Sequence, residues 1–257
     1  MTHPFQAFAL EPGGPTFAEL LGSVDWEEAG KGRRGAVLVE PVQGSIPIVR
    51  TTTRYNNPAQ RFVDAHRLLA AKIGEASGVD CGFNNALIEH YDERYRKMGF
   101  HCDQALDLAA GSSIAVYSCY KNPEDPPTRR LVIEQKTGEV DERSEIVMTH
   151  GSVIMFSLDT NQRFRHKIVP AVSNGASVGD NDWLGVTFRQ SKTFIDFSVG
   201  TPRFSDGTRL ELANEEQAAT FFRLRGQENR EVNFAYPELS FTVSASDLVP
   251  PVGATSR

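Results

Sequence analysis

The chain has 257 residues, 40% of them hydrophobic, which is enough to bury a sizeable core as one large domain or as a core with an appendage. Its formal net charge is −6 and its pI is near 5.6. There is no basic tail and no run of five or six like charges, so the composition argues mildly against tight binding of duplex nucleic acid, although a local basic patch remains compatible with it.

The cysteines and the N-terminus indicate the compartment. Cys81, Cys102 and Cys119 are odd in number and lack a CxxC spacing, which predicts reduced thiols and neither a disulfide framework nor a zinc site. The opening residues, MTHPFQAFALEPGGP, lack a basic stretch followed by a long apolar one, and no apolar run reaches 18 residues. We therefore expect a soluble cytoplasmic protein without a membrane partner.

The first 82 residues combine short elements with one helix. Residues 1–50 mix short apolar runs such as AVLVEPV and IPIV with glycine and proline, which predicts short strands and turns. Asn57-Pro58 resembles an N-cap followed by proline at the first helical position. Apolar residues then follow at helical spacing, at Phe62, Ala65, Leu69 and Ile73. The pattern predicts an amphipathic helix from Pro58 to about Ser77, with its apolar stripe in the core.

From Phe83 the pattern changes to short runs rich in Val, Ile, Phe and Tyr: FNNALIEHY, SIAVYSCY, RLVIEQ, SEIVM, SVIMFSL, HKIVPAV and LGVTFR. They are separated by turn sequences such as KNPEDPPT, KTGEVDE and THG. Many short strands at close spacing predict an antiparallel sandwich or barrel. A Gly/Ser/Asn/Asp segment, Ser173 to Asp182, is expected to be a mobile loop at one mouth of that barrel.

After Phe197 the character changes again. The sequence NEEQ at 214–217 resembles a capping box, and Gly226 is the expected end of the helix that it starts. Apolar residues on one side of this helix are Phe221, Phe222 and Leu224. We expect three regions: 1–82 supporting the barrel and a substrate mouth, 83–197 forming the core, and 198–257 forming an α+β extension without chemistry of its own.

The stretch GFHCDQ contains His101-x-Asp103. With six histidines in the chain, a chance His-x-Asp is expected about 0.3 times, so the motif alone proves little. A mononuclear non-haem iron oxygenase needs two imidazoles and one carboxylate on one face of the metal, with the opposite positions open. Residues two apart on a β-strand point the same way, so His101 and Asp103 would both face a barrel interior.

A third ligand must come from a distant strand. His166, in RFRHKIVP, opens a predicted strand 63 residues after Asp103, whereas His150 lies in the turn-like THGS. The cosubstrate in this chemistry is a dianion, and the arginine fork pairs with a carboxylate bidentately. Arg189 ends the apolar run LGVTFR, where it either meets such an anion or reaches solvent at the strand end.

The order of these motifs resembles a known family. FNNALIEHYDERYRKMGFHCD, GSSIAVYSCY, HGSVIMF, TNQRFRHKIVP and VTFR, over about residues 83–190, follow the pattern of the AlkB-like iron(II)/2-oxoglutarate dioxygenases, and most closely that of the DNA-repair AlkB homologues. The resemblance implies a mainly β fold with a double-stranded β-helix (jelly-roll) core. It also implies hydroxylation by Fe(II) and O2 coupled to decarboxylation of 2-oxoglutarate to succinate and CO2.

The resemblance also assigns roles to individual residues. It implies that His101, Asp103 and His166 are the iron ligands. It implies that Tyr91 hydrogen-bonds the cosubstrate and that Arg189 holds the cosubstrate near the iron.

Two positions depart from the family pattern. Glu89 stands where the family usually has an asparagine that contacts the cosubstrate, and Trp183 stands where a second arginine pairs with its far carboxylate. A carboxylate facing a dianion repels it, and a missing arginine removes a bidentate pair. Three explanations are open: another base replaces the arginine, Glu89 pairs with Arg189 or a nearby base, or the cosubstrate is not ordinary 2-oxoglutarate. The candidate bases are Arg130, Arg165 and Lys167.

The substrate side is less defined. In the nucleic-acid enzymes of this family, loops before the core flip and clamp a base. The corresponding stretch, VRTTTRYNNPAQRF, contains Arg50, Arg54, Tyr55 and Arg61. These residues form either a polar mouth or a solvated strand and helix cap, and we favour the second interpretation, which leaves the substrate-binding residues unknown.

Three functions follow. A dioxygenase of a small-molecule or nucleotide-like substrate is favoured by the acidic pI, and an AlkB-type nucleic-acid N-dealkylase by the resemblance. A catalytically silent barrel used for binding is supported by Glu89 and Trp183 alone. A halogenase is disfavoured because Asp103 fills the position that halogenation needs open.

Overall fold

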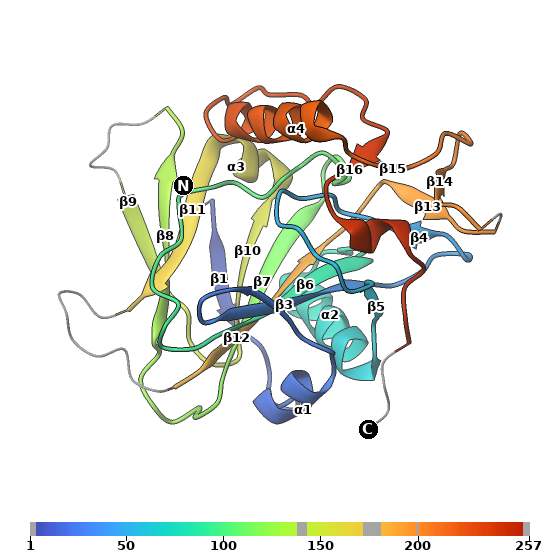
Figure 1. The fold of residues 1–257 in the computed structure, drawn as a ribbon. Helices are drawn as coiled ribbons and strands as arrows, with labels where there is room; N and C mark the ends of the chain where they lie inside the picture. The colour runs from blue at the N-terminus through green and yellow to red at the C-terminus, as the bar shows by residue number, and fades with distance from the viewer. Residues whose placement is uncertain (1–3, 138–142, 172–180, 199, 254–257) are drawn as a thin grey trace.

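The computed structural model describes residues 4–137, 143–171, 181–198 and 200–253, and its fold is mostly β-sheet (Figure 1). The largest sheet runs in the order β1 (Gln6–Ala9), β10 (Ser152–Ser157), β7 (Ser113–Tyr120), β12 (Trp183–Arg189), β6 (Asn85–Tyr91), β3 (Arg33–Val39) and β2 (Glu27–Gly30), with β5 (Gln60–Arg61) beside β3. A second sheet, named the three-stranded sheet, has the order β11 (Phe164–Pro170), β8 (Arg129–Gln135) and β9 (Arg143–Val147). The predicted strands of the central region correspond to β6 through β12, and their pairing is antiparallel, as expected.

Smaller elements complete the fold. Two further sheets contain β14 (Arg203–Phe204), β13 (Phe194–Asp196) and β4 (Ile46–Pro47), and β15 (Glu211–Leu212) with β16 (Phe241–Thr242). The helices are α1 (Phe17–Gly22), α2 (Asp64–Ser77), α3 (Leu158–Arg163), α4 (Glu215–Glu228) and a 3-10 turn at Ala245–Leu248. No helix in the described ranges has the length and apolar character needed to cross a membrane. All three cysteines are buried free thiols.

The two faces of the large sheet bury different cores. Side chains alternate along each strand, so Ile88 of β6 and Val186 of β12 pack with Leu69 of α2 on one face. On the other face, Ile154 of β10 packs with Ile168 of β11, between the two sheets. In Figure 1, α1 and α2 lie below the large sheet, the three-stranded sheet lies to its left, and α4 lies across the top. The candidate site lies on the face toward the three-stranded sheet.

The helix predicted from Pro58 begins at Asp64 instead, although it ends at Ser77 as expected. The first part of the predicted span is held as a strand, because Gln60 and Arg61 pair with β3. The Gln60 side chain also exchanges hydrogen bonds with the backbone of Asp25, at 2.8 and 2.7 Å. Tertiary pairing therefore overrides the local Asn-Pro signal.

The C-terminal helix starts as predicted and ends later. Asn214 and Gln217 exchange the two capping-box hydrogen bonds, each 2.9 Å. The helix passes through Gly226 to Glu228, so the predicted stop is wrong. Phe222 is 44% exposed and does not join the buried stripe. The short helix α1 lies in the region predicted as strands and turns, and the predicted loop Ser173–Asp182 lies outside the described residues up to position 180.

Candidate metal centre

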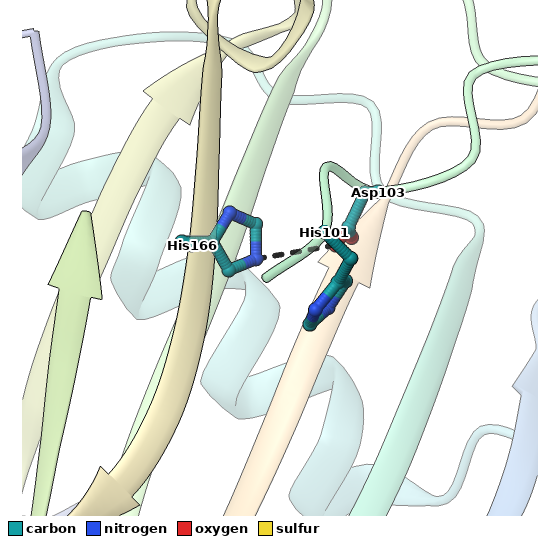
Figure 2. Close-up of side chains that lie close together, drawn as sticks. All are labelled: His101, Asp103 and His166. Carbon is teal, nitrogen blue, oxygen red and sulfur yellow. Dashed lines mark ion pairs between the residues drawn. The ribbon is translucent and has the colours of Figure 1, made fainter. Parts of the chain in front are cut away.

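Three side chains from distant parts of the sequence converge at one point. The potential ligand atoms of His101, Asp103 and His166 all lie within 4.8 Å of one another. Figure 2 shows the three side chains facing a common space, with His166 Nε2 3.5 Å from Asp103 Oδ1. Two imidazoles and one carboxylate form the donor set of a mononuclear non-haem iron site.

The ligands are held in two different ways. His166 is the third residue of strand β11 and points to the inner face of the three-stranded sheet. His101 belongs to an irregular segment that meets β11 through a single bridge, with N–H···O distances of 3.0 and 2.7 Å between His101 and His166. The expectation that His101-x-Asp103 lies on a regular strand is therefore wrong, because the backbone pairing stops at His101 and Asp103 follows in irregular backbone.

Asparagine and helix residues fix this irregular segment. Asn161 of α3 accepts a hydrogen bond from the Asp103 N–H and donates one to the Asp103 carbonyl, both 2.8 Å. From the end of α4, Arg225 donates to the Cys102 carbonyl, and Glu228 accepts the Ala105 N–H at 2.8 Å. These contacts satisfy backbone groups that regular pairing would otherwise satisfy. The extension was expected to carry no chemistry, yet its helix holds the segment that bears two candidate ligands.

Arg189 is directed at Asp103. Its Nε and Nη2 donate to Asp103 Oδ2 at 2.8 and 2.6 Å, and the residue is buried rather than reaching solvent. Burial by itself raises the pKa of the Asp103 carboxyl, but Arg189 and His166 outweigh burial and hold that pKa well below its usual range. The carboxylate is therefore ionised at neutral pH, as a metal ligand must be.

His101 has the protonation state that a metal ligand requires. Burial, with a smaller contribution from nearby His166, lowers the pKa of His101 to about 3. Its Nδ1 lies 3.0 Å from the Gly99 carbonyl, which assigns the ring proton to Nδ1 and leaves the Nε2 lone pair for a metal. In His166 it is Nε2 that approaches Asp103.

The triad lines a cavity of about 450 Å³. Its apolar wall consists of Val49, Leu87, Val116, Leu131 and Ile168. Thr51, Thr52, Thr53, Lys97, Phe100, Gln104 and Asn229 also contribute to its lining. A larger cleft of about 830 Å³ lies beside the same irregular segment, but none of the three candidate ligands lines it. We therefore place the site in the smaller cavity.

Glu89 is neutralised by an arginine from the N-terminal region, outside the three bases expected from the sequence. Arg33 of β3 donates to Glu89 Oε1 through Nε at 2.7 Å and Nη2 at 2.5 Å. The Tyr91 hydroxyl donates to Glu89 Oε2 at 3.0 Å. Of the two partners proposed for Glu89, the nearby base is therefore found, and Arg189 is not. Tyr91 is fully buried, and its contact with a cosubstrate stays a prediction.

Trp183 occupies the space beside Glu89. Its indole packs against the Tyr91 ring, with centroids 4.7 Å apart. The indole also covers Gly185, where an added Cβ would lie 2.0 Å from it. The indole Nε1 is buried without a hydrogen-bond partner among the described residues. Where the family pattern has an arginine, the chain therefore has a buried indole that does not line the cavity.

The three replacement bases named from the sequence do not line the cavity. Strand alternation directs Arg130, Arg165 and Lys167 to the outer face of the three-stranded sheet. There Arg130 pairs with Glu145 at 3.1 Å, and Arg165 pairs with Glu134 at 2.7 Å. Lys167 lies over the Phe100 ring, 4.2 Å from its centroid. The expectation that one of these three bases replaces the missing arginine is therefore wrong.

The suggested polar mouth does not form. Arg50 is buried and pairs with Asp107 at 2.7 Å, and Tyr55 is also buried. Arg54 stacks on Phe222, 5.9 Å from its ring centroid, and Arg61 is exposed on β5. None of the four lines the cavity. The favoured interpretation, a solvated strand and helix cap, is met by the exposed Arg54 and Arg61 in part, and it is wrong for Arg50 and Tyr55, which are core residues.

No model of a known protein family and no curated protein sequence matches this chain. Among solved structures, the chain is similar to a structure of OsALKBH1, with a TM-score of 0.43 and 16% identity over 67% of this chain and 87% of that one. It is also similar to a Pseudomonas putida prolyl-4-hydroxylase, with a TM-score of 0.41 and 15% identity over 74% of this chain and 94% of that one. OsALKBH1 bears the name of the AlkB homologues that the motifs resemble.

Proposed function

We propose that the protein is an Fe(II)/2-oxoglutarate-dependent dioxygenase that hydroxylates or oxidatively demethylates a small-molecule or nucleotide-like substrate. The observation that carries the proposal is the convergence of His101, Asp103 and His166 within 4.8 Å in the wall of one cavity. The donor set fits Fe(II), because the imidazole of His101 is neutral and the carboxylate of Asp103 is ionised. The two sheets that enclose the site support a double-stranded β-helix core.

The protein residues have separate tasks in this proposal. His101, Asp103 and His166 would hold the metal, which when bound supplies dioxygen activation coupled to decarboxylation of 2-oxoglutarate to succinate and CO2. Arg189 keeps the Asp103 carboxylate ionised and turned toward the two imidazoles. The apolar wall of the cavity would present an apolar surface to the substrate.

The size of the cavity supports a small substrate. A volume of about 450 Å³ lies within the usual range for small-molecule sites, about 300–1,000 Å³. The alternative, an AlkB-type nucleic-acid N-dealkylase, loses the support of Arg50 and Tyr55, which are buried in the fold and cannot clamp a base. A cytoplasmic location without a membrane partner remains part of the proposal.

Succinate formation tests the proposal. The protein is incubated with Fe(II), 2-oxoglutarate, O2 and a panel of small molecules, methylated nucleotides and methylated oligonucleotides, with Asp103→Ala as the control variant. We expect succinate from the wild type and none above background from the variant. Formaldehyde from methylated oligonucleotides, without turnover of small molecules, would favour the nucleic-acid alternative. Equal succinate from both proteins, or none from either, would contradict the proposed activity and favour a silent barrel.

A further inference from the structure

The cavity contains one arginine whose role is not explained by the metal site. Among the described residues that line the cavity, the lysine and arginine side chains are those of Arg33, Lys97, Arg189 and Arg225. Arg189 is committed to Asp103, and Arg225 to Glu228 and the Cys102 carbonyl. Lys97 is exposed to solvent. Arg33 is therefore the enclosed cation of the cavity that is bound neither to a candidate metal ligand nor to the segment that carries two of them.

The strand register places Arg33 in line with Trp183. Across the large sheet, Arg33 lies opposite Tyr91, and Tyr91 lies opposite Trp183. Directly opposite residues share a face, so all three side chains project toward the candidate site. In the next row, Glu89 lies between Gly35 and Gly185. Because both neighbours lack side chains, the longer side chains of Arg33 and Trp183 approach Glu89 from opposite sides.

The Arg33 guanidinium is only partly used by Glu89. Its Nε and Nη2 both donate to Oε1 of Glu89, and Nη1 makes no hydrogen bond to any of the described residues. The side chain is 20% exposed, so the guanidinium is enclosed and still reachable from the cavity. The Tyr91 hydroxyl donates to the other oxygen of Glu89. This hydrogen bond fixes the carboxylate, and the carboxylate in turn fixes Arg33. The guanidinium is therefore fixed in place with donors left for a second anion.

We propose that Arg33 binds the distal carboxylate of the oxo-acid cosubstrate and that Glu89 positions Arg33 for this role. The inference rests on the proposed function, which supplies a cosubstrate with two carboxylates. It requires that Arg33 distinguish 2-oxoglutarate from a 2-oxo acid that lacks the distal carboxylate. Glu89 weakens this interaction, because its own negative charge competes for the same guanidinium.

Calorimetric titration of the Fe(II)-loaded protein under anaerobic conditions tests the inference, with 2-oxoglutarate and pyruvate as the two ligands. Arg33→Met should weaken 2-oxoglutarate binding by about 10- to 100-fold, the usual effect of losing a charge-assisted pair. Pyruvate binding should not change. Glu89→Gln should tighten 2-oxoglutarate binding. Arg34→Met is the matched control, because Arg34 lies on the opposite face, over the Trp26 ring.

The double variant Arg33→Met/Glu89→Gln separates ligand binding from charge balance. The double variant leaves neither Arg33 nor Glu89 as an unpaired charge. It can therefore be measured even if Arg33→Met fails to fold. The proposal predicts that the double variant binds 2-oxoglutarate less weakly than Arg33→Met, because the Glu89 charge is gone, but still well below the wild type, because the guanidinium is missing. Recovery of wild-type affinity would overturn the proposal, because Arg33 would then serve only to neutralise Glu89. Unchanged 2-oxoglutarate affinity in Arg33→Met, or equal losses for both ligands, would also overturn it while the proposed function stands. A wild type that binds neither oxo acid would refute both.

Discussion

His166 and the His101–Asp103 pair reach the same point in the molecule by different means. His166 is fixed by a regular strand, because β11 pairs with β8 along its whole length. His101 and Asp103 lie in irregular backbone that Asn161, Arg225 and Glu228 hold through side-chain hydrogen bonds. The difference shows that one of the three candidate ligands depends on the sheet and two depend on side chains of α3 and α4, which act as a clamp on the irregular segment. Variants that weaken each kind of support separately test this division.

The largest effect is expected at Asn161, where one side chain satisfies both backbone groups of Asp103. Asn161→Ala leaves two buried groups unpaired, at about 1–3 kcal/mol each, so we expect the free energy of unfolding to fall by about 3 kcal/mol. Iron affinity should fall as well, because Asp103 is no longer held. Urea denaturation and anaerobic Fe(II) titration measure the two effects. The neighbouring Gln162→Ala serves as the control. Equal effects of the two variants would contradict the role of Asn161 in holding Asp103.

Arg225 tests the contribution of α4. Arg225→Ala removes the donor to the Cys102 carbonyl and the partner of Glu228. We expect iron affinity to fall by about 10- to 100-fold, the usual effect of losing a residue that supports a metal ligand. Arg223→Ala, on the same helix but exposed, should bind iron like the wild type. If Arg225→Ala kept full affinity in an anaerobic Fe(II) titration, α4 would have no part in the site.

The free energy of unfolding should depend on pH through two histidines. His101 lies in the irregular segment of the site, and His66 lies on the face of the large sheet that α2 covers. Burial is the main cause that lowers the pKa of His101 to about 3 and that of His66 to about 4. The unfolded chain takes up these protons near pH 6.5. Stability of the metal-free protein should therefore be complete above pH 6.5 and decline as the pH falls toward the two folded values.

His66 provides the sharper measurement because its side chain is fully buried. Its contribution should amount to about 1.4 kcal/mol per pH unit. In urea denaturation between pH 7 and pH 5, His66→Gln should therefore show a shallower decline than the wild type. A wild-type stability that does not change over this range would disprove the neutral state of both histidines in the folded protein.

The smallest effect on stability and iron affinity is expected at Arg165, next to His166 on β11. Arg165 precedes His166, but it points outward and pairs with the partly buried Glu134. Arg165→Ala should cost about 1 kcal/mol of stability and leave iron affinity unchanged, because Glu134 keeps its ion pair with Arg143 and the backbone pairing of β11 persists. A loss of affinity comparable to that of Arg225→Ala would mean that the strand alone does not fix His166.

The sequence predicts the strand-held part of the molecule well. The apolar runs from SIAVYSCY to LGVTFR match β7 through β12, because their alternation and their bounding turns are local properties. His166 and Arg189 could be placed for the same reason, since each belongs to such a run. Helix α2 was predicted too early because pairing of Gln60 with β3 is a tertiary effect that Asn57-Pro58 does not reveal.

The clamp and Arg33 could not be found in this way. Arg225 contacts a carbonyl 123 positions away, and Glu89 meets a partner 56 positions earlier in the chain. Neither contact has a local pattern. The one available signal was the charged pair Arg225 and Glu228 near the end of an otherwise amphipathic helix. The bases Arg130, Arg165 and Lys167 lie on strands after the motif, whereas the register of β3 against β6 supplies Arg33 from the N-terminal region.

The central claim is that His101, Asp103 and His166 form one iron site that accepts an oxo acid. The most direct measurement mixes the protein anaerobically with Fe(II) and 2-oxoglutarate and records iron stoichiometry together with the weak visible charge-transfer band of the chelate, with His166→Ala as the control. We predict one iron per chain and a band in the wild type, and neither in the variant. Iron binding or a band of equal strength in His166→Ala, or neither in the wild type, would contradict the account.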